Sequence, residues 1–446
     1  MLSVMKEEQG KRWRNGSHTW ESTPEKTLYP SSVEEVVAIV HEAAKEKKRI
    51  RVIGAGHSFT PLAKTDDWLI SLDLLCGIEQ IDEENGTVTV LGGTRLHQLG
   101  KILGQDGYAQ ENLGDINVQS IAGAISTGTH GTGLSFGNIS TQVTELVIVT
   151  ASGEVLSLSE KQHADYFKAC LVSLGALGII VKVKLKIMKT PVYEYTSEKM
   201  EYFLLEQQLE QLIEENRHFE FFLFPYSNRV QVKKMNRTKQ KPQPLFFHRM
   251  KNLILENYLF YVLSEFSRIV PKASKFISQI SALGVGTAKV AANSHELFAT
   301  PRLVKFREME YCIPLEHFKE AIQKVRKCIE VNNYRVHFPI ECRTVKADDI
   351  WLSPSYQRNS AYIAFHMYKG MPYLDYFRDM EAIMLEYEGR PHWGKMHSLG
   401  TKELFSKYPK LPDFLAVRAE LDPHGMFLND YLKTLWLDET EHPIKV

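Results

Sequence analysis

The stretch Arg51-Val52-Ile53-Gly54-Ala55-Gly56-His57-Ser58-Phe59 decides how the rest of the chain is interpreted. A short run of apolar, β-forming residues ends in two glycines, which let the backbone turn sharply and bring N–H groups close to a ligand. His57 stands at the tip of that turn. The pattern indicates an anion-binding turn that carries a nucleophile, although on this stretch alone a plain strand-to-loop turn with a surface histidine is the commoner structure.

A second stretch rich in glycine and hydroxyl groups, residues 120–133, strengthens the ligand interpretation. Small residues of this kind fill a core poorly but can wrap closely around a flat polyanion. The stretch is not a Walker A loop, since no Gly-Lys-Ser/Thr follows, and it lacks the GxGxxG spacing of a Rossmann turn. Its backbone N–H groups and hydroxyls are expected to bind a pyrophosphate, and the residues concerned are Ser120, Gly123, Ser126, Thr127, Gly128 and Gly131.

Length and composition indicate a two-lobe globular protein without a charged partner. The 446 residues exceed one ordinary domain, and 43% of them are hydrophobic. A formal net charge of zero gives no global attraction to nucleic acid or to anionic membranes. The five cysteines are scattered without CxxC spacing, which predicts reduced thiols in a cytoplasmic protein and no metal site. Residues 1–14 lack the apolar core of a signal peptide, and no membrane span is expected.

The order of elements predicts an α+β fold. A helix capped by Ser31 or Ser32 precedes the strand Ile50–Ile53. Further first-lobe strands are expected at Trp68–Leu75, Thr87–Leu91, Thr144–Thr150, Glu154–Leu158 and Gly178–Met188, with helices at Thr94–Leu103 and Tyr166–Leu177. After Thr190-Pro191 the second lobe is expected to mix the strands Phe219–Phe224, Val336–Thr344 and Ala361–Tyr368 with the helices Glu201–Asn216 and Leu315–Asn332.

Residues 240–295 combine basic and apolar residues. A helical hairpin packed on the second lobe is the favoured interpretation, because Glu256 and Glu265 interrupt the apolar run. Weak peripheral attachment to a membrane is the alternative.

Five features in this order resemble one enzyme family. They are the Gly-Ala-Gly-His-Ser turn, the stretch 120–133, the pair Glu341/Arg343, the cluster Pro391-His392-Trp393-Gly394-Lys395, and the ending Asp422-Pro423 to Phe427. Together they resemble the aldonolactone oxidase group of the vanillyl-alcohol-oxidase-type flavoproteins, which includes gulonolactone and arabinonolactone oxidases, galactonolactone dehydrogenase and alditol oxidase. The resemblance covers residues 15 to 440.

The resemblance implies a PCMH-type FAD-binding domain with an α+β cap domain that covers the flavin. We expect the FAD-binding domain at residues 15–190, the cap at 191–415, and a C-terminal segment, 416–446, that returns to the FAD-binding domain. His57 matches the position that bonds covalently to the flavin in oxidase members. The other implied cofactor contacts are Val52, Ile53, Gly54, Ala55, Gly56, Ser58, Gly114, Asp115, Ser120, Gly123, Ala124, Ile125, Ser126, Thr127, Ile179 and His392.

The resemblance also bears on the acceptor and the donor. Gly114 aligns with the position where a methyl group hinders oxygen in the galactonolactone dehydrogenase, so glycine there implies an oxidase that makes hydrogen peroxide. Asp115 departs from the serine of alditol oxidase at the neighbouring position, which argues against an alditol as donor. An aldono-1,4-lactone oxidised at C2 is therefore the expected substrate. An alditol (polyol) oxidase and a lactone dehydrogenase with a non-oxygen acceptor are the alternatives.

Four second-lobe residues are the expected catalytic groups. Glu341 and Arg343 lie two apart in a predicted strand and so project on one face; the resemblance makes them substrate anchors, whereas without it they would be taken for a surface ion pair. Lys395 is expected to orient the reacting hydroxyl or to stabilise anionic flavin. His366 is either an active-site histidine or a core histidine, and His130 is expected to close the glycine-rich turn.

Overall fold

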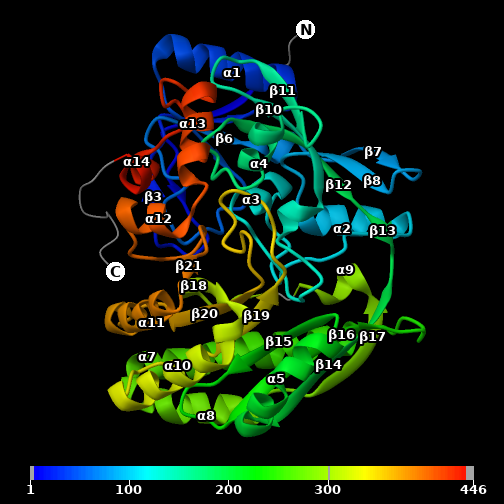
Figure 1. The fold of residues 1–446 in the computed structure, drawn as a ribbon, viewed down its shortest axis with the longest axis vertical. Coiled ribbons are helices and arrows are strands. Elements are labelled where there is room, and N and C mark those ends of the chain that lie inside the picture. The colour runs from blue at the N-terminus through cyan, green and yellow to red at the C-terminus, as the bar shows by residue number, and fades with distance from the viewer. Residues whose placement is uncertain (1–4, 300–301, 438–446) are drawn as a thin grey trace.

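The computed structural model describes residues 5–299 and 302–437. The predicted α+β class is confirmed: helices and strands mix throughout, in an upper and a lower part of the molecule as drawn in Figure 1. The last nine residues of the expected C-terminal segment, and the first four of the segment assessed for a signal peptide, lie outside the described residues.

The upper part contains two larger sheets. In the four-stranded sheet, β4 and β5 each pair parallel with β6, and β1 pairs antiparallel with β4. Its order is β1 (Lys6–Gln9), β4 (Lys26–Tyr29), β6 (Trp68–Ser71), β5 (Ile50–Ile53). The antiparallel five-stranded sheet has the order β11 (Val155–Ser159), β10 (Val143–Val149), β12 (Ile179–Lys186), β8 (Thr87–Leu91), β7 (Ile78–Asp82). Two small ribbons pair β2 (Trp13–Arg14) with β3 (Glu21–Ser22) and β9 (Tyr108–Ala109) with β13 (Met188–Lys189).

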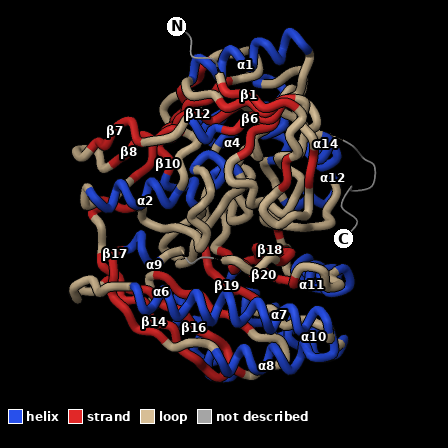
Figure 2. The backbone as a smooth tube through the Cα atoms, turned by 180° about the vertical axis from the view of Figure 1, so that it is seen from behind, coloured by secondary structure: helices blue, strands red, loops and turns tan. Residues whose placement is uncertain are grey.

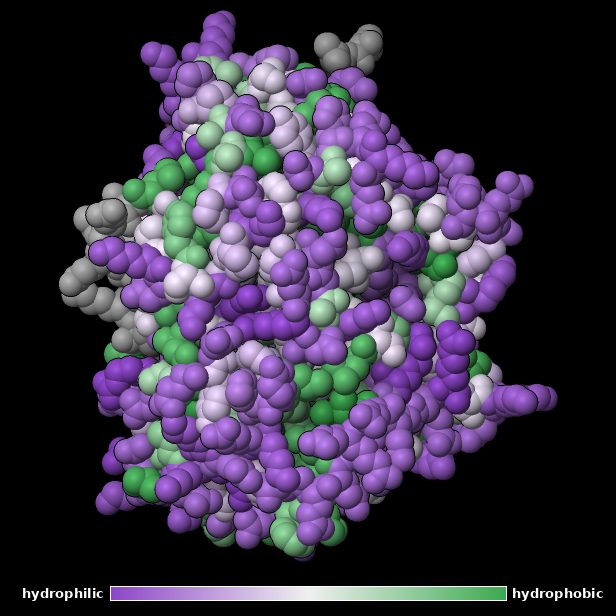
Figure 3. Space-filling model, viewed as in Figure 1, coloured by the Kyte–Doolittle hydropathy of each residue, from purple (hydrophilic) through white to green (hydrophobic). Residues whose placement is uncertain are grey.

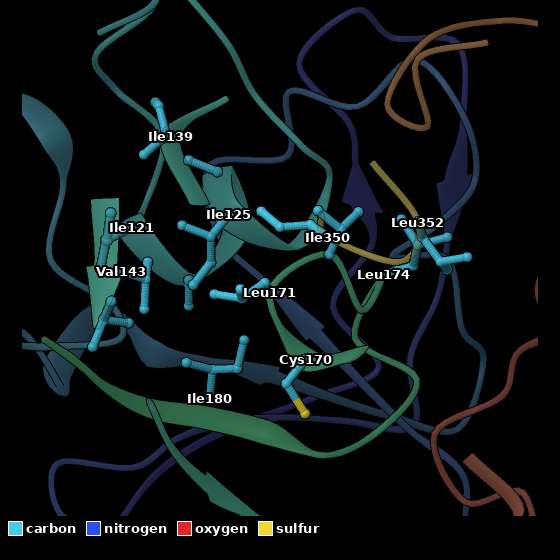
Figure 4. Close-up of a cluster of buried hydrophobic side chains, with 14 of the residues drawn as sticks. Ile121, Ile125, Ile139, Val143, Cys170, Leu171, Leu174, Ile180, Ile350 and Leu352 are labelled. Carbon is cyan, nitrogen blue, oxygen red and sulfur yellow. The ribbon is translucent and has the colours of Figure 1, made fainter. Parts of the chain in front are cut away.

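Helices from both ends of the chain cover these sheets. Of the two serines that the sequence allowed as the cap, Ser32 caps α1 by accepting a hydrogen bond from the N–H of Glu35. The early helices are α1 (Val33–Glu46), α2 (Leu96–Gln105), α3 (Ile121–Ser126) and α4 (Ala164–Cys170), and the late ones are α12 (Thr401–Lys407), α13 (Leu411–Leu421) and α14 (Asp430–Trp436). Figure 4 shows part of the shared core, where Ile350 and Leu352 from the loop after β19 reach Ile125 and Leu174 of the upper part.

The lower part is an eight-stranded antiparallel sheet with helices on its faces (Figures 1 and 2). Its order is β17 (Ala288–Asn293), β14 (Val192–Glu201), β16 (Arg229–Arg237), β15 (His218–Leu223), β19 (Ile340–Val345), β20 (Ser360–Tyr368), β18 (Phe306–Pro314), β21 (Arg390–Pro391). Apolar residues of α5 (Tyr202–Glu215), α10 (Phe318–Asn332) and α11 (Leu374–Glu386) join its main core. The short helix α9 (Ser294–Leu297) follows β17.

Residues 246–284 form a chain of helices against this sheet. They are α6 (Phe246–Asn252), the π-helical η3 (Leu253–Leu259), α7 (Phe260–Ile269), the 3-10 turn η4 (Pro271–Ala273) and α8 (Ser274–Gly284). The Phe260 ring packs edge-on to that of Phe338, which fixes α7 to the chain just before β19. Among the described residues, no helix combines the length and apolar character needed to cross a bilayer.

Several expected elements differ in extent. The strand expected at Trp68–Leu75 stops at Ser71, where the 3-10 turn η1 (Leu72–Leu74) begins. The helix expected at Tyr166–Leu177 ends at Cys170, because the chain turns at Leu174 and Gly175, which both have positive φ. Strand β18 was not expected, although charged and apolar residues alternate in Glu308-Met309-Glu310-Tyr311, a spacing that is compatible with a strand.

The two parts meet along short backbone contacts. The N–H of Phe59 donates to the carbonyl of Gly394 over 2.7 Å, and that of Gly133 donates to the carbonyl of Thr344 over 2.8 Å. Loops that follow β5 and α3 are thereby set against one face of the eight-stranded sheet.

Candidate active site

The two glycine-rich stretches touch and line one cavity. A Cβ added at Gly54 would lie 2.2 Å from the Oγ of Ser120, so only glycine permits this approach. Gly56 has φ of +68°, which turns the chain toward His57. Ser120 caps α3, its Oγ accepting from the N–H of Gly123 over 3.3 Å. The first cavity is therefore walled mainly by backbone and by small side chains.

The N-terminal arm holds the His57 turn from outside, which the sequence did not predict. The N–H of Gly16 donates to the carbonyl of Gly56 over 2.7 Å. The Nδ2 of Asn15, a residue 1% exposed, donates to the carbonyl of Ser58 over 2.9 Å. Asparagine and glycine at 15–16 are a turn signal in the sequence, but nothing local indicates that the turn would pair with residues 56–58.

Most of the expected cofactor residues line this cavity. They are Val52, Ile53, Gly54, Ala55, Gly56, His57, Ser58, Ser120, Gly123, Ser126, Thr127 and Ile179. Ala124 and Ile125 do not, because their side chains point into the hydrophobic core, where Figure 4 shows Ile125. Gly114, Asp115 and His392 line a second cavity, which shares His57 and Ser58 with the first.

The second cavity is faced by a row of charged side chains across the eight-stranded sheet. Glu341 and Arg343 of β19 share a face, as predicted, and both are buried. Arg343 lies opposite Glu220 of β15, and His366 of β20 opposite Glu308 of β18. The alternation of strand side chains places Glu310 on the same face as Glu308.

Arg343 is the centre of a buried ionic cluster. Its Nη2 lies 2.7 Å from Asp115 Oδ1, its Nε lies 2.9 Å from Glu220 Oε2, and it also pairs with Glu341. Arg302 contacts Asp115 from the other side and lies 3.9 Å from Glu341. The cluster therefore fixes three carboxylates and two guanidinium groups beside the cavity.

Lys395 belongs to a separate group. Its ammonium pairs with the carboxylate of Glu308, whose other oxygen lies 3.4 Å from Nε2 of His366. Nδ1 of His366 lies 3.0 Å from the carbonyl oxygen of Pro339, which can only accept, so that nitrogen carries a proton. Lys395 is thus held in the cavity rather than solvated at the surface.

His130 and His392 flank Glu310. His130 Nε2 lies 3.1 Å from the Glu310 carboxylate and its Nδ1 lies 2.9 Å from the carbonyl of Gly131, so the ring closes the glycine-rich turn as expected and also bridges to β18. Nδ1 of His392 accepts the N–H of Gly394 over 3.0 Å. One ligand atom each of His130, Glu310 and His392 lie within 4.8 Å of one another, close enough to bind a metal ion. Both ring nitrogens of His130, however, already contact oxygen atoms of Gly131 and Glu310.

Burial and charge together set the protonation of the site. Burial alone would raise the pKa of the Asp115 carboxyl, but Arg343 and Arg302 outweigh it and hold that pKa well below its usual range. Burial also opposes the charge on Glu310, yet His130 lowers its pKa to about 2. Burial lowers the pKa of His392 to about 4 and, helped by the charge of Lys395, lowers that of His57. Both of these imidazoles are therefore neutral at pH 7.

Four residues of the site were missed by the sequence analysis: Arg302, Glu220, Glu308 and Glu310. The two glutamates of β18 carry a usable signal, since Glu-x-Glu in an apolar strand places two carboxylates on one face, as Glu-x-Arg does in β19. Glu220 and Arg302 carry none, because their relevance comes only from strand pairing and from chain far away in sequence.

Family models match most of the chain. A model described as D-arabinono-1,4-lactone oxidase matches residues 183–435, and one described as an FAD binding domain matches residues 24–159.

Curated relatives match along nearly the whole length. The chain is 38% identical to the L-gulono-1,4-lactone dehydrogenase of Mycobacterium tuberculosis (strain ATCC 25618 / H37Rv), over 94% of this chain and 98% of the relative. It is 33% identical to the L-gulonolactone oxidase of Bos taurus, over 96% and 98%. Among solved structures, a mutant of cholesterol oxidase from Brevibacterium sterolicum superposes with a TM-score of 0.83 at 17% identity, over 97% of this chain and 98% of that one, which shows a shared fold.

The first cavity fits FAD. Its glycine turns offer backbone N–H groups at short range. The buried guanidinium of Arg51 donates to the carbonyls of Leu62, Leu174, Gly175 and Phe427 and so braces the cavity wall. Within the described chain, the side-chain oxygen of Gln119 is buried without a hydrogen-bond partner, and Gln119 lines both cavities. A polar ligand group that spans the two cavities would therefore find an acceptor there.

Proposed function

The chain belongs to the D-arabinono-1,4-lactone oxidase family of FAD-dependent oxidoreductases, and from this premise we propose the following reaction. The enzyme oxidises the C2 carbinol of a sugar-derived aldono-1,4-lactone to a ketone, and the electrons pass to oxygen to give hydrogen peroxide. The observation that carries the proposal is the single cavity in which the His57 turn faces Glu341, Arg343, His366 and Lys395.

FAD, when bound, supplies an electron-accepting ring that takes up a hydride. The residues of the first cavity would hold it: Gly54 to Ser58 and Ser120 to Thr127 through backbone N–H groups and hydroxyls, and Ile179 by packing. His57, neutral at pH 7, has a free lone pair with which to attach the cofactor covalently. Gly114, Asp115 and His392 would border the ring from the second cavity.

The sheet face binds and orients the lactone. Glu341 accepts hydrogen bonds from sugar hydroxyls, and Arg343 donates to lactone or hydroxyl oxygens. Asp115 and Glu220 keep the Arg343 fork in place, so it needs little reorganisation when substrate enters. Lys395, held by Glu308, donates to the reacting hydroxyl oxygen, and His366 beside the same carboxylate is placed to accept its proton.

Acid precipitation of the purified protein tests the covalent tether. Yellow colour that stays in the pellet is expected, because an imidazole–flavin bond survives denaturation. His57→Ala should release the flavin into the supernatant while the protein stays folded by circular dichroism. His424→Ala, at an exposed histidine, is the matched control and should retain it. Quantitative release from the wild type would rule out the tether.

A donor screen with peroxide detection tests the reaction itself. Aldono-1,4-lactones should bleach the flavin absorbance anaerobically and produce peroxide in air, and open-chain alditols should do neither. Bleaching by alditols alone would favour the polyol oxidase.

A dehydrogenase that uses another acceptor is the second candidate. It is favoured by the 38% identical relative that is named a dehydrogenase. Gly114 is weaker support for an oxidase over a dehydrogenase than the sequence suggested. A Cβ at this position would lie 2.9 Å from the backbone carbonyl oxygen of His130, so packing alone requires glycine there. Lactone turnover with an artificial acceptor and no peroxide in air would identify the dehydrogenase.

A further inference from the structure

We propose that the outer face of the helices at residues 246–284 is a docking surface for a lipid bilayer with anionic headgroups. The face is defined by its exposed apolar side chains, which come from α6, η3, α7 and α8. They include Phe247 at 83% exposure, Ile269 at 69% and Val262 at 61%, together with Ile254, Tyr258, Leu259, Tyr261, Phe266, Phe276 and Leu283. Many exposed apolar side chains gathered on one run of helices mark an interaction site.

The buried residues of α7 are serines, which reverses the usual arrangement, and α8 buries serines beside the apolar Ile277 and Ala282. Ser264, Ser267, Ser274 and Ser278 are almost fully buried, and so is Asn257. Ser264 bonds to His337 over 2.9 Å, and Ser267 bonds to Ser274 over 2.7 Å. A helix that turns serines toward the protein and phenylalanines outward is suited to apolar surroundings on its outside.

The helix α10 follows the normal pattern. In α10, Phe318, Ile322, Val325 and Ile329 are buried against the sheet and the outer positions are mostly charged. The reversal is therefore a property of residues 246–284 and not of the whole cap. Figure 2 shows α6 and α7 in front of the strands, whereas the opposite side in Figure 3 is mostly hydrophilic apart from a group of apolar side chains in its lower half.

Charge selects a bilayer over a second copy of the chain. Residues 239–275 carry seven lysines and arginines against two glutamates, although the chain as a whole has no net charge. Lys239, Lys241, Arg249, Lys272 and Lys275 are all exposed around the apolar face. A second copy would bring this positive charge against itself, whereas anionic headgroups complement it while the apolar side chains enter the acyl boundary.

The docking face adjoins a cavity of about 1080 Å³. That cavity is lined by Phe246, Arg249, Met250 and Leu253 of α6 and η3, and also by Asp115 and Arg343. Docking through α6 would thus place one wall of the route to the active site next to the bilayer.

Vesicle co-sedimentation of the full-length holoenzyme tests the proposal. Protein should pellet with phosphatidylglycerol/phosphatidylcholine vesicles and much less with phosphatidylcholine alone, and high salt should weaken the binding. The triple variant Phe247→Ser/Val262→Ser/Ile269→Ser should reduce the bound fraction at least about tenfold, because three large apolar side chains no longer leave water. Lactone turnover in solution should stay unchanged.

A matched variant separates docking from general surface hydrophobicity. The control variant Phe203→Ser/Val331→Ser removes two exposed apolar side chains outside the docking face: Phe203 of α5, 62% exposed, and Val331 of α10, 74% exposed. It should leave vesicle binding intact. Equal loss in both variants, or no pelleting of the wild type with anionic vesicles, would overturn the proposal. So would a wild-type dimer in light scattering that the triple variant dissociates, because a second copy would then cover the face.

Discussion

The two walls of the active site are built in opposite ways. The wall from the upper part is made of backbone and small side chains brought together at contacts such as Gly54 against Ser120. The wall from the sheet is made of buried charges, with Arg343 between Asp115, Glu220 and Glu341. The first can hold a cofactor because nothing protrudes from it, and the second can orient a polar substrate because its charges are already fixed.

Removing the central cation should have the largest effect on stability. Arg343→Met leaves three buried carboxylates short of a partner, which should cost about 3–5 kcal/mol of unfolding free energy. Lactone turnover should be lost as well. The shift in the urea midpoint measures the first effect.

An exposed pair provides the comparison for that variant. Arg229 lies 3.2 Å from Glu201 at the surface, so Arg229→Met should cost only about 0–1 kcal/mol. If Arg343→Met were equally mild, the charged wall would be relaxed by water rather than preorganised.

Acid should weaken the sheet wall selectively. The pKa of Glu310 is about 2 in the folded protein and 4.5 as its usual value, so its ionised form stabilises the fold fully above pH 4.5. That contribution, about 3 kcal/mol, is lost as the pH falls from 4.5 to 2. Unfolding free energies of wild type and Glu310→Gln should therefore converge over this window.

A surface glutamate serves as the control for the acid experiment. Glu214→Gln, on the exposed side of α5, should run parallel to the wild type at every pH. A constant gap between wild type and Glu310→Gln down to pH 2 would contradict the assigned pairing with His130.

The comparison also explains what the sequence could predict. The glycine wall is local: Gly54 to Ser58 and Ser120 to Thr127 reveal their turns through residue type alone, and most of them line the cavity. Ala124 and Ile125 fall in the same stretch yet face the core, because residues three or four apart share a helix face and Gly123, Ser126 and Thr127 take the face toward the cavity. The sheet wall depends on register across β15, β19, β20 and β18. Glu341 and Arg343 were accessible through the resemblance, but Glu220 and Arg302 acquire partners only once distant segments pair.

A methyl group at Gly54 should open the glycine wall. In Gly54→Ala the added Cβ would meet Ser120 Oγ at 2.2 Å, so the contact between the two glycine-rich stretches must shift. This should lower the free energy of unfolding by about 2 kcal/mol. Flavin content per protein should drop. Gly284→Ala, where a Cβ meets nothing within 4 Å, should change neither quantity. Full flavin content in Gly54→Ala would mean that the contact between Gly54 and Ser120 can shift without weakening flavin binding.

Deleting one cap should give the smallest effect and the finest separation between folding and cofactor binding. Ser120 caps α3 and Ser32 caps α1 in the same way: the side-chain oxygen accepts a hydrogen bond from the N–H three residues on. Ser120→Ala and Ser32→Ala should each cost about 1 kcal/mol. Only Ser120 lines the first cavity, so only its variant should also bind flavin more weakly, as seen by dialysis in a His57→Ala background that lacks the tether. Equal flavin loss in both variants would show that the glycine wall responds to global stability rather than to its own local geometry.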